Sequence, residues 1–160
     1  MIIICDSSPL IALAHIDQLN LPDALFSEVI IPEAVYKEIS ITTKPFASVL
    51  SNWCHNKIRK PENLDTVATF SSILGEGESE AFVLYQETCA DLVLLDDAKA
   101  RRIANKEGIR FIGTLGMLAV AKRHGLLIEI KPMLLNLREA GMWITDEILL
   151  EILQDVGENL

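Results

Sequence analysis

The sequence predicts an α/β fold with a parallel sheet and helices on both of its faces. Short apolar runs typical of buried strands alternate along the chain with longer segments of helical pattern. Pro9 and Pro32 stand at expected first helical positions, and Gly125, Gly141 and Gly157 stand at expected helix ends. The chain has 160 residues and is 50% hydrophobic, which is enough for one domain with a substantial core.

The expected elements can be placed by residue range. Strands are expected at 2–5, 28–31, 92–95 and 110–112, with an edge strand at 57–59. Helices are expected at 8–19 with Ser8 as its N-cap, from Pro32 onward, and at 46–53, 64–73, 77–88, 98–107, 115–124, 132–140 and 146–156. We expect residues 1–160 to form a single domain, with the helices from about 132 packed on it or used in an interface.

Composition excludes several classes of protein. The formal net charge of -9 argues against a protein that coats nucleic acid non-specifically, because that mode needs a broad basic surface. No apolar run approaches the roughly 20 residues needed to cross a bilayer. The first apolar run stops at Asp6, which is unlike a secretory leader, so a cytoplasmic location is expected. Three widely spaced cysteines suit reduced thiols better than disulfides.

Aspartates follow two of the expected strands directly. Asp6 comes after the apolar residues 1–5, and the Asp96 and Asp97 pair comes after 92–95. The ligand crevice of an open parallel sheet lies beyond the carboxyl ends of its strands, so these carboxylates are expected on one rim. Asp6 is alternatively a turn residue that accepts main-chain N–H groups. One of the pair is expected to cap the following helix while the other faces the crevice, and the sequence leaves open which does so.

Glutamates on two expected helices are further candidates. Glu38 lies near the boundary of an apolar helix face, although most single helical glutamates are simply solvated. The run Glu76, Glu78 and Glu80 opens a helix, where negative side chains are favoured by the helix dipole in any case. Helical spacing places Glu78 above the apolar face, so we prefer it, with Glu80 as the reserve and Glu76 as a capping residue.

Carboxylates that share one pocket require a counterion. Two unit charges about 4 Å apart repel each other by about 4 kcal/mol at an effective dielectric constant near 20. Since the expected cluster contains oxygen ligands and neither histidine nor cysteine, Mg2+ or Mn2+ is the expected cofactor. Such a site is typical of metal-dependent phosphodiester hydrolysis.

Candidate nucleic-acid contacts lie close to the Asp96 and Asp97 pair. Lys99, Arg102 and Lys106 form a basic stripe at helical spacing, which is either a track for a phosphate backbone or a solvated face. Thr114 follows the next expected strand and either presents its hydroxyl to a phosphate or caps a helix. The two tryptophans, Trp53 and Trp143, are expected as core or interface anchors rather than as platforms for base stacking.

These segments resemble motifs of the PIN-domain family across nearly the whole chain. Ile-Cys-Asp-Ser-Ser-Pro-Leu-Ile resembles its opening motif with Asp6, and Ile-Pro-Glu-Ala-Val-Tyr-Lys-Glu-Ile resembles the segment that ends in the second acid, Glu38. A gapless placement puts the third acid on Glu78 and the fourth on Asp97. Gly-Glu-Gly-Glu-Ser-Glu-Ala, Leu-Asp-Asp-Ala-Lys-Ala-Arg and Gly-Thr-Leu-Gly resemble the signature of one branch of that family. Two features depart from the family pattern: a glutamate as the third acid, and Leu95 where many relatives carry Thr or Ser.

The resemblance implies a three-layer α/β/α sandwich with a central parallel sheet. It implies an endoribonuclease that depends on Mg2+ or Mn2+ and cleaves single-stranded RNA, as VapC-like toxins do, with single-stranded or structured RNA as its binding partner. Asp6, Glu38, Glu78 and Asp97 would then be catalytic and would hold the metal, with Asp96 and Glu80 as further metal candidates. The expected partners are RNA, a small antitoxin protein and a second copy of the chain, with no membrane.

Two other functions fit parts of the sequence. The first is a catalytically weak or inactive PIN-like module that binds nucleic acid or protein; the low basic content favours it and the complete acidic set opposes it. The second is a haloacid-dehalogenase-like phosphatase, which also places an aspartate after its first strand. That chemistry usually needs a second aspartate two residues later, where this chain has Ser8.

Overall fold

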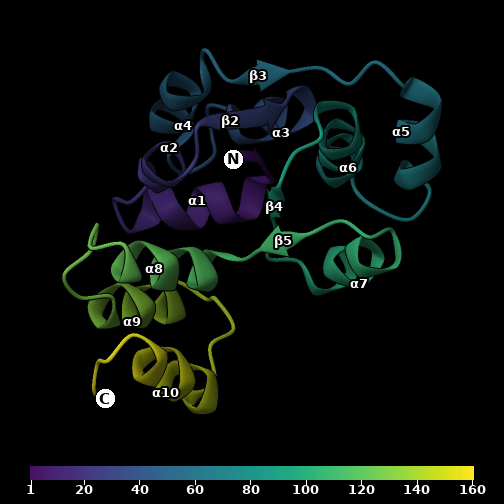
Figure 1. Cartoon of the computed structure of the whole chain (residues 1–160). Coiled ribbons are helices and arrows are strands. Elements are labelled where there is room, and N and C mark those ends of the chain that lie inside the picture. The colour runs from purple at the N-terminus through teal and green to yellow at the C-terminus, as the bar shows by residue number, and fades with distance from the viewer.

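A five-stranded parallel sheet forms the centre of the protein in a computed structural model that describes residues 1–160 (Figure 1). The strand order is β3-β2-β1-β4-β5, and each neighbouring pair is parallel. The strands are β1 (Ile2–Cys5), β2 (Glu28–Pro32), β3 (Ile58–Arg59), β4 (Leu92–Leu94) and β5 (Phe111–Ile112). The expected edge strand at 57–59 is present as β3, and the most N-terminal strand, β1, lies in the middle of the sheet.

Ten helices surround this sheet. They are α1 (Ser7–His15), α2 (Leu21–Leu25), α3 (Glu33–Ile39), α4 (Ala47–Cys54), α5 (Leu64–Ser71), α6 (Glu76–Thr88), α7 (Ala98–Lys106), α8 (Thr114–Arg123), α9 (Lys131–Glu139) and α10 (Asp146–Asp155). None of them is both long and apolar enough to span a bilayer.

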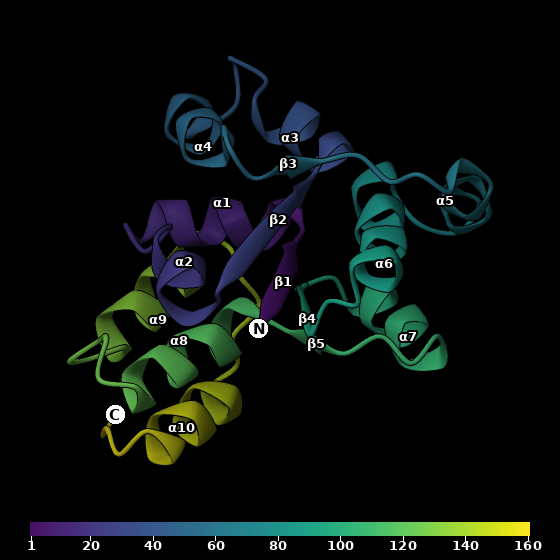
Figure 2. The ribbon, with the colours of Figure 1, turned by 45° about the horizontal axis from the view of Figure 1, so that its top comes forward.

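Helices cover both faces of the sheet, as its alternating side chains require. Ile3 and Cys5 of β1 point into one hydrophobic cluster, which includes buried residues of α1, α3, α4, α8, α9 and α10. Ile4 points the opposite way, into a second cluster with α5, α6 and α7. Figure 2 shows α1, α8 and α9 on one side of β1 and α6 and α7 on the other. The predicted α/β/α sandwich is therefore confirmed.

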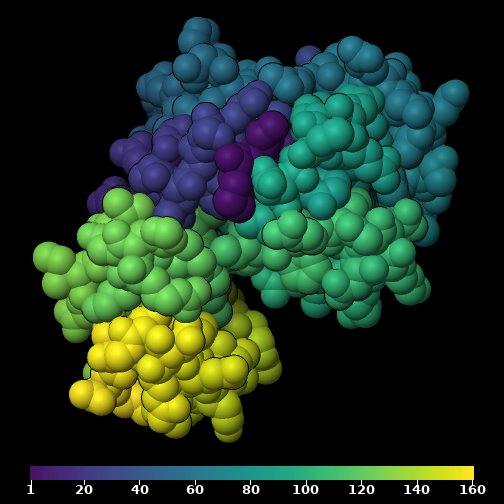
Figure 3. All heavy atoms as spheres, in the orientation of Figure 1, coloured from purple at the N-terminus to yellow at the C-terminus, as the bar shows by residue number.

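The last two helices belong to the first of these clusters. Leu134 and Leu137 of α9 and Leu149 and Leu153 of α10 are all buried in it. In Figure 3 the chain from α8 onward forms a lobe at one end of the molecule. The expected helix ends at Gly125, Gly141 and Gly157 are also present, each with a positive φ (74°, 103° and 76°).

The first helix differs from the prediction at both ends. Its N-cap is Asp6 rather than Ser8, and the Asp6 side chain makes no capping hydrogen bond. The helix ends at His15, well before residue 19, because Asp17 takes a left-handed conformation with φ 55° that interrupts the helix. A short helix, α2, then follows with Pro22 in its first turn. The apolar residues between 16 and 21 continue the helical pattern, so the sequence did not reveal this break.

Candidate active site

Asp6 lies at the carboxyl end of the central strand β1, where its carboxylate is almost fully enclosed. Its side chain is 3% exposed, and its main-chain N–H donates to the Leu94 carbonyl of β4 at 3.1 Å. That hydrogen bond extends the parallel pairing of β1 with β4 beyond Cys5 and Leu94. Asp96 and Asp97 follow shortly after the end of β4. Asp6 and this pair therefore lie at the same edge of the sheet, as the sequence predicted.

Glu38 of α3 lies close to Asp6, and Gly77 in the N-terminal turn of α6 faces both of them. A Cβ atom added at the buried Gly77 would lie 3.4 Å from Asp6 Oδ1 and 3.7 Å from Glu38 Oε2. The same atom would lie 3.0 Å from Val35 Cγ2 of α3, which is too close for a normal contact. A side chain at position 77 would therefore fill the space that Asp6 and Glu38 share, and glycine leaves that space open.

The pKa values of Asp6 and Glu78 are affected by acids that lie on other elements of the fold. The pKa of Asp6 is raised from 3.8 to about 7, mainly because burial disfavours its charged form, with further contributions from Glu78, Glu38 and Asp96. The main-chain N–H of Ser7 partly opposes this shift. The pKa of Glu78 is also raised, first by burial and then by Asp97 and Glu38, against the opposing hydrogen bond from Gly75. These carboxylates therefore stand close enough to disfavour one another's charge.

Asp96 is held by hydrogen bonds to both of its carboxylate oxygens. The Thr114 N–H donates to Oδ1 at 2.8 Å, and the Thr114 hydroxyl donates to Oδ2 at 2.6 Å. Arg101 Nη2 contacts Oδ1 at 3.4 Å. Thr114 itself is fully buried, so its hydroxyl is committed to positioning Asp96. The sequence had left open whether Thr114 faces a phosphate.

Asp97 and Glu78 each cap a helix with one oxygen only. Asp97 Oδ1 accepts from the Ala100 N–H at 2.8 Å at the start of α7, so the member of the pair that caps the helix is Asp97. Glu78 Oε2 accepts from the Gly75 N–H at 3.0 Å at the start of α6. The other oxygen of each carboxylate, Asp97 Oδ2 and Glu78 Oε1, has no hydrogen-bond partner within the protein.

Glu80 has a different neighbourhood from Glu78. Its Oε2 accepts from the Ala34 N–H at 2.8 Å, in the first turn of α3. With Glu38, Glu76 and Lys37 it lines a hollow of about 470 Å³ between α3 and α6. Glu80 therefore ties α6 to the start of α3.

The donor set of this site fits a hard divalent cation by its chemistry. All the candidate ligands are carboxylate oxygens, which Mg2+ and Mn2+ prefer, and a cation would offset both the burial and the neighbouring acids that raise the pKa of Asp6. No group of three or more His, Cys, Asp or Glu side chains is arranged closely enough to hold a metal ion as these side chains stand. A metal held by these acids would require rotation of side chains such as Asp97 and Glu78, each of which has an oxygen free of hydrogen bonds.

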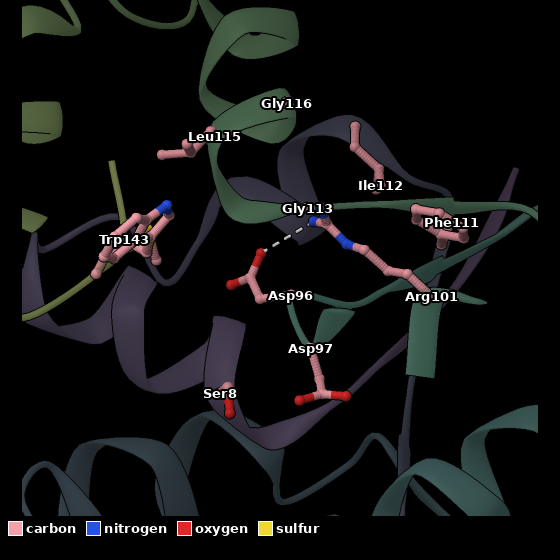
Figure 4. A pocket seen from close by; sticks show the side chains of 11 residues that line it. Ser8, Asp96, Asp97, Arg101, Phe111, Ile112, Gly113, Leu115, Gly116 and Trp143 are labelled. Atoms are coloured by element: carbon pink, nitrogen blue, oxygen red, sulfur yellow. Dashed lines mark hydrogen bonds and ion pairs between the residues drawn. The ribbon is translucent and has the colours of Figure 1, made fainter. Parts of the chain in front are cut away.

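A hollow of about 530 Å³ opens beside the aspartates, and it contains a cation that the sequence analysis missed (Figure 4). Asp96 and Asp97 line it together with Arg101 and Trp143. The predicted basic stripe of Lys99, Arg102 and Lys106 is exposed on α7 and does not line this hollow. Trp143 is 84% exposed and is not part of the core, contrary to one of the two roles expected for it.

Arg101 could not be recognised from helical spacing. Its side chain turns back toward the sheet, where Nε donates to the Leu95 carbonyl at 2.9 Å and the guanidinium lies over the Phe111 ring at 5.4 Å. The only local signal was Gly113, at which a Cβ would lie 2.0 Å from Arg101 Nη2. A glycine directly after a strand indicates close approach of another group, but it does not identify which one.

The fold and the site together define an α/β/α protein with an acidic crevice at the carboxyl edge of a parallel sheet. The family model described as a PIN domain matches residues 2–158. The chain belongs to the PIN-domain family, whose members are generally metal-dependent nucleases that act on nucleic acids. The chain matches no curated protein and no solved structure at a significant level.

Proposed function

We propose that this protein is an endoribonuclease that depends on Mg2+ or Mn2+ and hydrolyses phosphodiester bonds of single-stranded RNA. The observation that carries the proposal is the meeting of Asp6 and Glu38 across Gly77, with Asp97 following the neighbouring strand β4. Three separate elements supply these acids to one edge of the sheet. A solvated surface acid needs no such convergence, and a structural acid in the core is usually paired with a cation or with hydrogen-bond donors.

Four residues are proposed to hold the metal: Asp6, Glu38, Glu78 and Asp97. Asp6 and Glu38 share one open space, and Glu78 and Asp97 each have an oxygen without a hydrogen bond. Asp96 has both oxygens occupied, so its role is to orient the β4 end of the site and to hold Arg101.

The metal and the protein divide the chemistry of the proposed reaction. A divalent cation supplies Lewis-acid stabilisation of the charge that develops on a phosphodiester during hydrolysis. Asp6 supplies a buried carboxylate, and no cationic group of the protein is among those that shift its pKa. Thr114 and Arg101 hold Asp96, and Asp97 caps the start of α7, so the main chain that carries these acids is fixed while Asp97 keeps one oxygen free.

The biological role is proposed to be that of a toxin in a toxin-antitoxin pair. The support is the resemblance of the Asp6, Glu38, Glu78 and Asp97 motifs to those of VapC-like proteins. On this proposal the protein forms a homodimer and a small antitoxin restrains it. Mass measurement in solution tests the first of these statements, and co-purification with the product of a neighbouring short gene tests the second.

A second candidate function is a PIN-like module with weak or no turnover that binds nucleic acid or protein. One observation favours it: no three acids are arranged to hold a metal as they stand. The net charge of -9 adds to it, because phosphate binding then depends on a few local cations such as Arg101.

The deciding experiment is cleavage of a labelled pool of mixed single-stranded RNA by the purified chain. Wild type is compared with Asp6→Asn, and with Asp65→Asn on the exposed surface of α5 as the matched control. We expect cleavage by wild type and by Asp65→Asn in Mg2+ or Mn2+, and none in EDTA or by Asp6→Asn. Absence of cleavage by folded wild type supports the binding module. Retained cleavage by Asp6→Asn removes Asp6 from the mechanism.

A further inference from the structure

The hollow beside the aspartates has chemically different walls. Asp96 and Asp97 lie in its middle, with Trp143 on one side and Arg101 and Phe111 on the other (Figure 4). Its volume of about 530 Å³ falls within the range of about 300–1,000 Å³ that is typical of small-ligand sites. A ligand that extends from the acids into this hollow therefore meets an aromatic face at one end and a guanidinium at the other.

The main chain before α10 presents Trp143 to solvent. Ile144 is buried at 5% exposure and Met142 packs against the same core cluster, while Trp143 between them is 84% exposed. With the side chains of residues 142 and 144 directed inward, the ring of Trp143 between them is directed outward. Trp143 makes no hydrogen bond or aromatic pair within the chain. A large ring held outward over a hollow in this way is available for stacking.

The opposite wall presents a guanidinium with unused donors. Arginine has five N–H donors, and Arg101 uses two of them, on the Leu95 carbonyl and on Asp96. Its side chain remains 36% exposed, and its contact with Phe111 holds the plane of the group in place. A positioned guanidinium with free N–H groups is suited to a phosphate oxygen.

We propose that this hollow binds one unpaired nucleotide of the substrate, with its base stacked on Trp143 and a phosphate contacting Arg101. This inference rests on the proposed function and gives a physical reason why the enzyme would act on single-stranded rather than double-stranded RNA. A base within a duplex stacks on its neighbours, so its face is not available to a side chain. Stacking also accepts any base, so the contact selects unpaired strands without reading their sequence.

The test uses the fluorescence of Trp143. In the full chain with Trp53→Phe, Trp143 is the only tryptophan. Titrations in Ca2+ buffer use an RNA octamer of uridines, the same octamer without bases, its DNA counterpart and a blunt RNA duplex. Strand integrity is checked on a denaturing gel. We expect quenching by the RNA octamer, and much less by the octamer without bases or by the duplex. Equal quenching by the DNA and RNA octamers would mean that the site recognises the base alone. Weaker quenching by DNA would mean that the site also contacts the ribose.

Affinity of the labelled RNA octamer, measured by anisotropy, tests the two walls separately. Trp143→Ala is expected to weaken binding about tenfold, and Trp143→Phe to restore most of that loss, since base stacking on an aromatic ring commonly contributes this much. Arg101→Gln is expected to weaken binding of the octamers with and without bases alike. The matched control is Ile128→Ala, at a side chain that is 94% exposed and does not line the hollow.

The inference and the proposed function fail in different ways. Suppose that the protein cleaves RNA, but that Trp143 fluorescence and RNA affinity are the same for octamers with and without bases. This result would overturn the stacking site and would leave the proposed nuclease activity intact. Quenching and a loss of affinity in Trp143→Ala without cleavage under any metal would support the site and overturn the nuclease. No binding of any octamer to wild type would overturn the site.

Discussion

Thr114 donates both its N–H and its hydroxyl to the carboxylate of Asp96, at 2.8 and 2.6 Å. This contact joins the start of α8 to the end of β4 and occupies both oxygens of Asp96. Its neighbour Asp97 caps α7 with a single oxygen, which leaves the other free. The two adjacent aspartates therefore differ in their contacts: both oxygens of Asp96 are hydrogen-bonded, whereas Asp97 keeps one oxygen free, which fits its proposed role as a metal ligand.

Substitution of these two aspartates should separate metal binding from stability. Asn caps helices about as well as Asp, so Asp97→Asn should change the metal-free free energy of unfolding by less than about 1 kcal/mol. It should nevertheless lose most of the stabilisation that Mn2+ confers, because a native-state ligand raises stability by linkage. Asp96→Asn should cost about 1–3 kcal/mol without metal, since it disrupts the bonds to Thr114 and Arg101. Thermal unfolding in EDTA and in Mn2+ measures both effects. If Asp97→Asn lowered the metal-free stability and Asp96→Asn abolished the effect of Mn2+, the roles assigned to the two residues would be wrong.

The raised pKa of Asp6 predicts how stability depends on pH in the absence of metal. The native protein retains this proton up to about pH 7, whereas the unfolded chain releases it near 3.8. Stability should therefore be highest below the unfolded pKa and decrease as pH rises from about 4 to about 7, with Glu78 contributing in the same direction. Asp6→Asn cannot titrate, so in EDTA at pH 8 it should be more stable than wild type by as much as about 4 kcal/mol.

Denaturant unfolding of the two proteins at several pH values measures this difference. The contributions of titrating groups far from Asp6 are shared by both proteins and largely cancel in the comparison. A difference in stability that stays constant between pH 4 and 8 would show that Asp6 titrates normally and that its carboxylate is not crowded by the other acids.

Gly77→Ala should interfere with the metal more than with folding. Alanine is favoured over glycine in a helix by about 1 kcal/mol, but its methyl group would lie 3.0 Å from Val35 and 3.4 Å from Asp6 Oδ1. We expect a nearly unchanged free energy of unfolding in EDTA and a loss of about tenfold in Mn2+ affinity.

Gly116→Ala of α8 is the matched control for this substitution. Its methyl group would lie 3.1 Å from an Ile112 carbon, so the crowding is similar, but no acid lies within contact distance. An equal loss of Mn2+ affinity in both variants would mean that Gly77 has no special place in the site.

The sequence was sufficient to predict the parallel sheet and the edge of it at which the acids lie. Apolar runs ending in Asp6 and in Asp96 identified two strands and the edge at which they meet, and these strands pair side by side as β1 and β4. The break after His15 was not predictable, because it depends on a left-handed Asp17 in a stretch whose apolar spacing continues. A polar residue in that conformation leaves no pattern that distinguishes it from an ordinary helical aspartate.

The hollow beside the acids was the least predictable part of the site. Helical spacing selected Lys99, Arg102 and Lys106, which are exposed, whereas the cation in the hollow is Arg101. Its position depends on the Leu95 carbonyl and on space left by Gly113, both of which are tertiary features. Trp143 likewise lies in an apolar stretch, and only the packing of its neighbours turns it outward.

Direct measurement of Mn2+ binding tests the central claim most closely. Electron paramagnetic resonance reports free Mn2+, so titration of wild type, Asp6→Asn and Asp65→Asn gives the affinity of each. We predict that wild type and Asp65→Asn bind Mn2+ at millimolar concentration or below, and that Asp6→Asn binds at least about a hundredfold more weakly, since even outer contacts of metal ligands are worth 10–100-fold. Equal binding by wild type and Asp6→Asn, or no binding by folded wild type, would contradict the account.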